Sequence, residues 1–378
     1  MDSIGLVLSG GGARGAYQAG VLSAISEVAM RNGLENPFLI YSGVSAGSIN
    51  AAIVAGFPGN FQKATSRLTK LWSEITTDSV FYADLLTLSR GSFDWVADFS
   101  FPSLKKAPST ARSIFSTTPL RSLLTQACHF ENIQRKIDYG NLQALAISTL
   151  DYDSISSKTF FQAHPLANPW DRPMHRGEKA ILSVDHVMAS SAIPMFFPPV
   201  KIDNRYYGDG CIRNQSPCAP AIYLGARRLV AVGVRRKTDT WYTYHHSESG
   251  APPSLARLIN VIFHSVMMDG LEADIQRITQ TNSHLALLSD FQKKSLSVRE
   301  VDCLWISPSV DFSKLAIQRS GEMPRLIRYL LSGFGSLSES SELVSYLLFD
   351  GSFCQQLIEI GFADGMKAEE EIKRILSP

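Results

Sequence analysis

A short apolar run, followed by a glycine cluster and then by a helical pattern, is the sequence feature that most limits the fold of this chain. The run Ile4–Leu8 has the continuous apolar character of a buried parallel strand, and the glycines from Gly10 to Gly15 end it. Apolar residues then recur at helical spacing as far as Asn32-Gly33, where we expect the helix to end. The segments 38–41 and 48–55 repeat the order of strand and helix. This order predicts a βαβ unit, a parallel sheet and an α/β fold.

The α/β pattern continues to about residue 235 and then changes. Two later strands are predicted, over 145–150 and 229–234. Beyond about residue 240 the strand signals fade, and helices are predicted over 257–268, 326–331, 342–349, 353–362 and 366–376. In a chain of 378 residues we therefore expect an α/β domain over residues 1–235, and a mainly helical C-terminal extension over 236–378 packed on it.

Composition excludes several classes of protein. The chain is 45% hydrophobic, too apolar for a disordered protein, and its net charge of +1 gives no field suited to nucleic acid. Five cysteines without a C-x-x-C pair indicate a reduced cytosolic protein. The N-terminus has no basic segment typical of a signal peptide, and the uncharged stretch 36–62 is too polar and glycine-rich at its centre for a membrane span. We expect a cytoplasmic protein without a signal peptide or transmembrane helix.

The glycine cluster has three interpretations. The spacing of Gly10, Gly12 and Gly15 matches a dinucleotide-binding loop, but that loop needs an acidic residue after the second strand, and the nearest acid, Glu35, precedes it. A phosphate loop needs Gly-Lys-Ser/Thr, which is absent at Gly15-Ala16-Tyr17. Another interpretation, a tight turn that binds no ligand, remains possible. The other possibility is a set of backbone N–H groups that bind negative charge at the start of a helix.

The segment Gly43-Val44-Ser45-Ala46-Gly47 has the form G-x-S-x-G. It stands where a buried strand meets a buried helix, which is the position of a nucleophile elbow. The sharp turn would expose the hydroxyl of Ser45, and the helix that follows would direct its first N–H groups at the same place. The alternative is a serine that only caps this helix.

The third motif is an aspartate between two glycines, Gly208-Asp209-Gly210. It follows the proline-rich apolar block 189–199. Taken alone, Asp-Gly indicates a hairpin turn.

The order of the three motifs, G-G-G-x-R-G, G-x-S-x-G and A-S-x-A-x-P-x-x-F-P-P leading to D-G, resembles the patatin-like phospholipase family. The resemblance covers about residues 4–235 and implies a three-layer α/β/α fold with a mostly parallel central sheet. It implies a serine–aspartate dyad that acts on lipid acyl esters without a metal or cofactor. Ser45 would be the nucleophile and Asp209 its base, with Gly10, Gly11, Gly12, Arg14 and Gly15 as the oxyanion loop, Gly43 and Gly47 at the elbow, and Gly210 after the aspartate. The residue after Gly210 departs from the family, which usually has Gly or Ala where this chain has Cys211.

The chemistry suited to these residues is acyl transfer through a covalent intermediate. We expect a phospholipase A or lysophospholipase, with a lipid as partner, transient contact with a membrane surface and no nucleic acid. A neutral glyceride lipase, a thioesterase and a catalytically silent lipid-binding module remain alternatives. A Ser–His–Asp hydrolase is disfavoured, because its elbow follows several strands and this one follows the second. None of the eight histidines lies in a metal-binding motif or in a glycine-flanked turn after a strand. Asp209 should be partly desolvated, which would raise its pKa. Arg14 should either polarise the oxyanion site or anchor the loop.

An insertion or lid is predicted over residues 78–118. Six aromatic residues lie between Phe81 and Phe101, and Lys105 and Lys106 follow them. Aromatic rings favour the lipid–water interface and lysines favour anionic head groups, so this segment is a candidate membrane-contacting surface. A helical cap that buries the rings against the core is the alternative.

Overall fold

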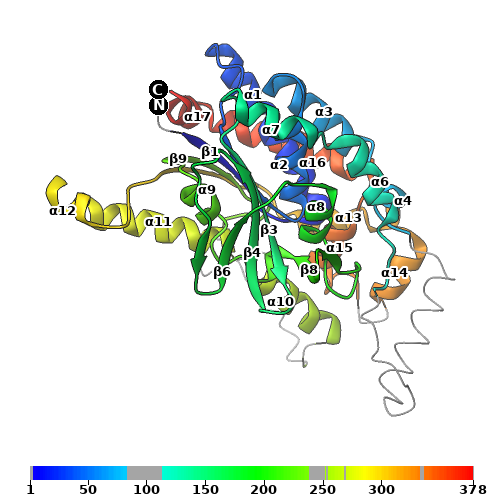
Figure 1. Cartoon of the computed structure of the whole chain (residues 1–378). Helices are drawn as coiled ribbons and strands as arrows, with labels where there is room; N and C mark the ends of the chain where they lie inside the picture. Colours follow the sequence, from blue (N-terminus) through cyan, green and yellow to red (C-terminus); the bar gives the residue numbers. More distant parts are fainter. Residues whose placement is uncertain are drawn as a thin grey trace.

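A mixed β-sheet runs through the centre of the molecule and carries helices on both faces (Figure 1). The computed structural model describes residues 3–82, 113–237, 252, 254–267, 270–332 and 336–377. Its strands are β1 (Ile4–Leu8), β2 (Ile40–Val44), β3 (Ala144–Asp151), β4 (Ser156–Ala163), β5 (Trp170–Arg172), β6 (His175–Lys179), β7 (Val200–Ile202), β8 (Arg205–Asp209), β9 (Arg228–Val232) and β10 (Asp302–Ile306). The order across the sheet is β10-β9-β1-β2-β3-β4-β6-β5, and β8 pairs with both β3 and β7.

Helices and short 3-10 turns fill the connections. The α-helices are α1 (Gly15–Arg31), α2 (Ala46–Gly56), α3 (Phe61–Ser73), α4 (Thr77–Val80), α6 (Thr118–Ala127), α7 (Glu131–Asp138), α8 (Val184–Ser190), α9 (Ala219–Tyr223), α10 (Leu255–Met267), α11 (Gly270–Ala286), α12 (Asp290–Ser295), α13 (Phe312–Gln318), α14 (Arg325–Ser332), α15 (Ser341–Leu347), α16 (Gly351–Lys367) and α17 (Glu369–Leu376). The 3-10 turns are η1 (Gly12–Arg14), η3 (Gly210–Ile212) and η4 (Ser320–Glu322).

The predicted α/β fold with three layers is confirmed. In the order β10-β9-β1-β2-β3, each strand is parallel to the next. Side chains of β1 alternate between two cores: Leu6 and Leu8 pack on the side of α1, α2 and α16, while Val7 packs on the side of α9 and α11. Because both faces of these strands are covered, they are continuous apolar runs, as expected of a buried parallel sheet.

The second strand and its helix differ from their predicted bounds. The strand runs over Ile40–Val44 instead of 38–41, and α2 begins at Ala46 instead of Ser48. Ser42 and Gly43 read as turn residues in the sequence, but in the structure they pair with Val7 and Leu8 of β1. A Cβ atom at Gly43 would lie 2.3 Å from the Gly47 carbonyl oxygen, so a small residue is needed for α2 to pack directly over the strand. The turn is therefore limited to Ser45.

Strand β10 was not expected from the sequence, where no strand was predicted after residue 240. It is an edge strand parallel to β9, with Leu304 and Ile306 packed on one face and Cys303 and Trp305 on the other. Most of its side chains are only half-buried, and it begins with the charged Asp302, so its apolar pattern is weak. In the same part of the chain, α16 packs along α1 (Figure 1). The division of domains at residue 235 remains a prediction.

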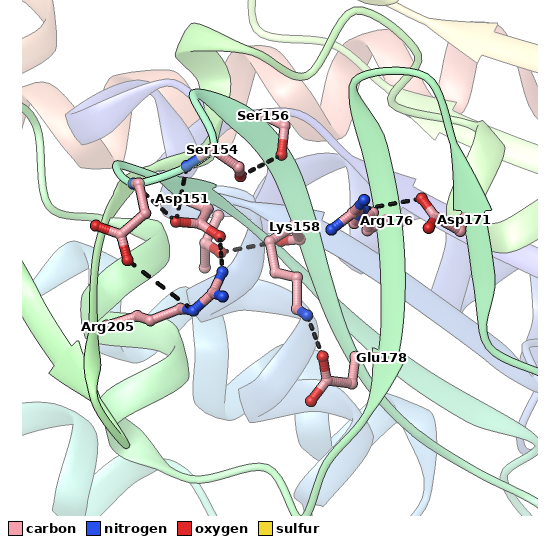
Figure 2. Close-up of polar contacts among 10 residues, drawn as sticks. Asp151, Ser154, Ser156, Lys158, Asp171, Arg176, Glu178 and Arg205 are labelled. Carbon is pink, nitrogen blue, oxygen red and sulfur yellow. Dashed lines mark hydrogen bonds and ion pairs between the residues drawn. The ribbon is translucent and has the colours of Figure 1, made fainter.

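Strands β4, β5, β6, β7 and β8, which the sequence analysis did not identify, extend the sheet beyond β3. Figure 2 shows polar pairs between β8 and β3, between β6 and β5, and between β4 and β6. Arg205, at the start of β8, donates a hydrogen bond to Asp151 Oδ2 at the end of β3, with Nη1 3.1 Å away. Arg176 of β6 donates to Asp171 of β5, and Lys158 of β4 pairs with Glu178. The Arg205–Asp151 contact fixes the start of β8, and β8 ends at Asp209.

Most of the predicted lid lies outside the described residues, because 83–112 are not among them. At its edges, Phe81 is buried and stacks on Phe115, with ring centroids 4.6 Å apart. Tyr82 and Ser116 form an isolated antiparallel bridge. Among the described helices, none has both the length and the apolar character needed to cross a bilayer.

Candidate active site

Ser45 occupies a strained turn between β2 and α2. Its φ of 53° and ψ of −129° lie in a region that residues other than glycine rarely adopt. The turn is tight on both sides, since a Cβ at Gly47 would lie 2.2 Å from the Leu8 carbonyl oxygen. The elbow predicted from G-x-S-x-G thus has the geometry of a nucleophile elbow, with the N-terminus of α2 directly after the serine.

The Ser45 hydroxyl donates a hydrogen bond to Asp209, with Oγ 2.7 Å from Oδ2. Both residues are buried, Ser45 at 2% exposure and Asp209 at 0%. Asp209 ends β8, which pairs with β3 so that Asp209 lies opposite Thr149. A 3-10 turn follows it, not the hairpin that Asp-Gly alone would indicate. Residues 164 positions apart in sequence are therefore brought into direct contact by one antiparallel strand pair.

Burial changes the acidity of Asp209. Loss of solvent raises the pKa of this carboxyl group from 3.8 to about 6, although its hydrogen bonds to Ser45 and Cys211 partly oppose the shift. The Cys211 backbone N–H donates to the other carboxylate oxygen, Oδ1, at 2.9 Å. The carboxylate is held on both oxygens, and its raised pKa makes it a stronger base than an exposed aspartate.

The glycine loop lies against the same serine. A Cβ at Gly10 would be 2.9 Å from Ser45 Cβ and 2.1 Å from Cys211 Sγ, so the loop is in close contact with both. In the part of the chain that the structure describes, the N–H groups of Gly11 and Gly12 have no hydrogen-bond acceptor. Gly12 has a φ of +55°, which favours glycine. These N–H groups are available for a developing negative charge.

Arg14 points away from this loop. Its guanidinium donates to Glu342 Oε2 at 2.5 Å and, through Nε, to Ser345 Oγ at 2.9 Å. The side chain is only 3% exposed. Of the two roles considered for Arg14, the contacts match an anchor that ties the loop to α15.

An apolar pocket opens beside Ser45 and Gly12. The side chains that form most of its wall are aliphatic or aromatic and come from four helices and two loops: Ile49, Trp72, Val80, Leu123, Phe197 and Phe349. Such a lining suits a hydrocarbon chain and offers little to a polar ligand.

The remaining predicted residues have structural contacts around the dyad. A Cβ at Gly210 would lie 2.4 Å from the Ser148 carbonyl oxygen, and one at Gly15 would lie 2.7 Å from the Trp72 ring, so both positions need a small residue. The Cys211 thiol packs in the gap between Gly10 and Asp209, and burial raises its pKa.

Two contacts of the candidate site were not predicted from the sequence. The Ser45 N–H donates to Ser190 Oγ at 2.9 Å, and Ser190 in turn donates to the Ser148 carbonyl at 2.6 Å. Ser190 lies in the apolar block before Asp209. The sequence analysis singled out this block but gave Ser190 no role. Tyr346 of α15 is fully buried, and its carbonyl oxygen lies 2.3 Å from where a Gly12 Cβ would be. Nothing in the C-terminal sequence marked this residue.

Several of the described histidines form contacts away from Ser45 and Asp209. His129 pairs with Glu131, His175 with Thr159 and His186 with Ser183. His245 and His246 lie outside the described residues. Across the described ranges, no group of three or more His, Cys, Asp or Glu side chains is arranged to hold a metal ion.

Known proteins resemble this chain in sequence. The family model described as patatin-like phospholipase matches residues 6–222. The uncharacterized protein YjjU of Escherichia coli (strain K12) is 27% identical over 270 residues, which cover 69% of this chain and 61% of that protein. Lysophospholipase nte1 of Aspergillus terreus (strain NIH 2624 / FGSC A1156) is 33% identical over 105 residues, or 25% of this chain and 6% of that protein. The matches thus span less than two thirds of the length of these relatives.

Among solved structures, human GIVD cytosolic phospholipase A2 in complex with methyl gamma-linolenyl fluorophosphonate aligns with 99% of this chain and 59% of its own. The identity is 12% and the TM-score 0.41, both too low to transfer a function to this chain. The family match is different, because it covers more than half of the sequence and includes all three motifs. The chain belongs to the patatin-like phospholipase family.

Proposed function

We propose that this protein hydrolyses carboxylic esters of glycerolipids, as a phospholipase A or lysophospholipase, with Ser45 and Asp209 as its catalytic dyad. The observation that carries the proposal is the 2.7 Å hydrogen bond from Ser45 Oγ to Asp209 Oδ2 beside an apolar pocket. Family membership supports a lipid hydrolase, and one relative is named a lysophospholipase. No metal or cofactor takes part in the proposed reaction.

In the first half of the reaction, Ser45 Oγ attacks the ester carbonyl carbon while Asp209 takes the hydroxyl proton. The negative charge that forms on the carbonyl oxygen is stabilised by the N–H groups of Gly11 and Gly12, and each such donor typically contributes about 10²–10³ in rate. Collapse of the tetrahedral intermediate breaks the bond to the alcohol, which leaves with the proton from Asp209. The acyl group is then bound to Ser45.

In the second half, water attacks the acyl-enzyme and Asp209 again accepts the proton. The fatty acid leaves and Ser45 recovers its hydroxyl. One group transfers every proton, so its pKa should lie near the working pH. The pKa of Asp209, raised by burial to about 6, meets this condition near neutrality.

The apolar pocket supports a fatty acyl ester over a small polar ester. Its lining at Ile49, Leu123 and Phe349 would bury hydrocarbon and expel water. A neutral glyceride lipase or a thioesterase would use the same dyad and pocket, and a silent module would bind lipid without turnover. Transient contact with a membrane surface from the cytoplasm belongs to the same proposal.

Product analysis tests the proposal. Purified protein is incubated with a phospholipid, a triglyceride and an acyl thioester that share one acyl chain, and released fatty acid is measured. We expect hydrolysis of the phospholipid by the wild type, and loss of hydrolysis together with loss of fluorophosphonate labelling in Ser45→Ala. The control is Ser26→Ala, which removes another buried serine hydroxyl that has no partner among the described residues. Labelling of Ser45→Ala at the wild-type rate would refute the nucleophile assignment.

A further inference from the structure

Helix α10, drawn below the sheet in Figure 1, is apolar on two sides, although one of them faces outward. On its inner side Ala256 is buried, and the Phe263 ring packs edge-on against Tyr346 of α15, with centroids 4.8 Å apart. Its outer face consists of four aliphatic residues at helical spacing, each between 48% and 64% exposed: Leu255, Leu258, Val261 and Ile262. A helix that is apolar all round is normally buried. In the part of the chain that the structure describes, no element covers this outer face.

Helix α10 is attached to the elements that form the candidate active site. It packs on α15 and on η3, the turn that follows the candidate base. The Asn260 side chain accepts a hydrogen bond from the Glu342 N–H at 3.1 Å. Glu342 and Tyr346 are also the residues of α15 that contact Arg14 and Gly12 of the glycine loop. A surface seated on the outer face would lie about one helix diameter, roughly 10 Å, from these elements.

The composition of the outer face fits lipid better than protein. Its side chains are all aliphatic, whereas the residues that dominate protein–protein binding are Trp, Tyr and Arg, with Leu and Val under-represented. Residues 255–267 include no Asp or Glu, so no negative charge on the helix itself repels phospholipid head groups. A helix with such an apolar face lies flat in the head-group region, with that face inserted by about 5–10 Å.

The size of the outer face argues against a second copy of this chain as its partner. A stable interface between proteins takes about 20–30 residues from each partner. The outer face supplies four residues, from a helix of 13 residues. Binding of a helix to a lipid surface has no such threshold, because its strength scales with the apolar area that is inserted. The outer face therefore suits a reversible contact with lipid.

We propose that the outer face of α10 docks on the lipid surface that contains the substrate and holds the dyad close to it. The inference rests on the proposed function and deepens it, since it assigns the membrane contact to a particular helix. This helix lies outside the segment 78–118, where the sequence analysis placed a candidate membrane-contacting surface.

Vesicle flotation tests the docking without turnover. Ser45→Ala is mixed with vesicles of phosphatidylcholine and phosphatidylglycerol, and the bound fraction is measured as the lipid concentration rises. Addition of Leu258→Gln and Ile262→Gln should weaken binding at least tenfold, because glutamine keeps the helix but removes two exposed aliphatic groups. The matched control is Ile181→Gln with Leu287→Gln, which changes residues that are 86% and 84% exposed outside α10. Absence of binding by Ser45→Ala, binding that the α10 pair leaves unchanged, or an equal fall in the control pair overturns the proposal.

Activity measurements separate docking from catalysis. In otherwise wild-type protein, Leu258→Gln with Ile262→Gln should lower kcat/KM for vesicle phospholipid at least tenfold, and leave kcat/KM for a water-soluble short-chain ester within twofold. Equal losses on both substrates would show damage to the site itself and overturn the proposal. A wild-type dimer that this pair dissociates, measured by analytical ultracentrifugation without lipid, would also overturn it, since the outer face would then bind a second copy. If wild type hydrolyses no ester but Ser45→Ala binds vesicles through α10, the proposed function fails while this surface stands.

Discussion

Asp209→Asn separates the proposed catalytic role of Asp209 from its effect on stability, and activity and stability should change in opposite directions. Asparagine has the shape of aspartate and can still bond to Ser45 Oγ and to the Cys211 N–H, the two partners of the carboxylate. It cannot accept a proton. We therefore expect kcat for a short-chain ester to fall by about 10²–10⁴, the usual contribution of a general base.

Stability should rise in the same variant, and the sign follows from proton linkage. The pKa of Asp209 is raised from 3.8 to about 6, so between these pH values the native state holds a proton that the unfolded chain has lost. Wild-type stability therefore declines as pH rises through this range, and above pH 6 the buried charge costs about 3 kcal/mol at 1.36 kcal/mol per pH unit. With about 2.1 cal/mol/K of unfolding entropy per residue over 378 residues, this corresponds to about 4 °C in Tm.

Thermal unfolding of wild type and Asp209→Asn at pH 4 and at pH 8, with ester hydrolysis on the same samples, checks both effects. The two Tm values should nearly coincide at pH 4, and the variant should be the more stable by several degrees at pH 8. Asp364→Asn, a buried carboxylate paired with Lys367 away from the dyad, is the activity control. An Asp209→Asn variant that is less stable than wild type at pH 8, or that keeps more than a tenth of kcat, would refute the reasoning.

Five further predictions concern this site and a glycine control outside it. In the wild type, kcat/KM for an uncharged ester should rise about tenfold per pH unit below pH 6 and level off above it, because only deprotonated Asp209 is a base; a profile that is flat between pH 5 and 7 would exclude it. Gly12→Ala should lower kcat strongly and destabilise the protein by more than about 2 kcal/mol, since its φ is positive and the new Cβ would meet a backbone oxygen at 2.3 Å. Gly33→Ala, with a positive φ but open space around it, should cost only about 1 kcal/mol in denaturant unfolding and leave kcat unchanged. Glu342→Gln should lower both stability and kcat, because it leaves the buried Arg14 guanidinium without its anion. Breaking such a buried ion pair costs about 3–5 kcal/mol, and a variant with wild-type Tm would contradict this prediction. His264→Gln should keep at least a tenth of kcat in a steady-state assay. This histidine is the sharpest test of a dyad because its helix, α10, packs on the turn after Asp209. A thousandfold loss in a folded variant would restore a histidine-dependent mechanism.

The sequence predicted those parts of the fold and site that depend on local pattern. The run Ile4–Leu8, the glycines after it and the motif around Ser45 each have a distinct signature, because a buried strand is continuously apolar and a tight turn needs small residues. The bounds of β2 were wrong because Ser42 and Gly43 are poor strand formers, and they pair there only because α2 must approach the sheet closely.

Contacts that depend on long-range packing left little trace in the sequence. The edge strand β10 has only a weak alternation, since most of its side chains are half-buried. The contact between Ser45 and Asp209 requires the antiparallel pairing of β8 with β3, and no pattern in either segment specifies that pairing. The family resemblance suggested the dyad, while the partners of Arg14 could be found only from the structure.

The partners of Arg14 indicate what holds the proposed oxyanion loop in place. Arg14 lies within the matched range 6–222, but Glu342 and Ser345, to which its guanidinium bonds, lie 120 residues or more beyond the end of that range. Tyr346, from the same helix, packs on Gly12 at the point where a side chain would overlap its carbonyl oxygen. An oxyanion site depends on N–H groups that are already in place when charge develops. Under the proposed mechanism, any element that fixes Gly11 and Gly12 would therefore contribute to catalysis without touching substrate. Helix α15 is such an element. The proposed active site therefore depends on the C-terminal region as well as on the three motifs of its family.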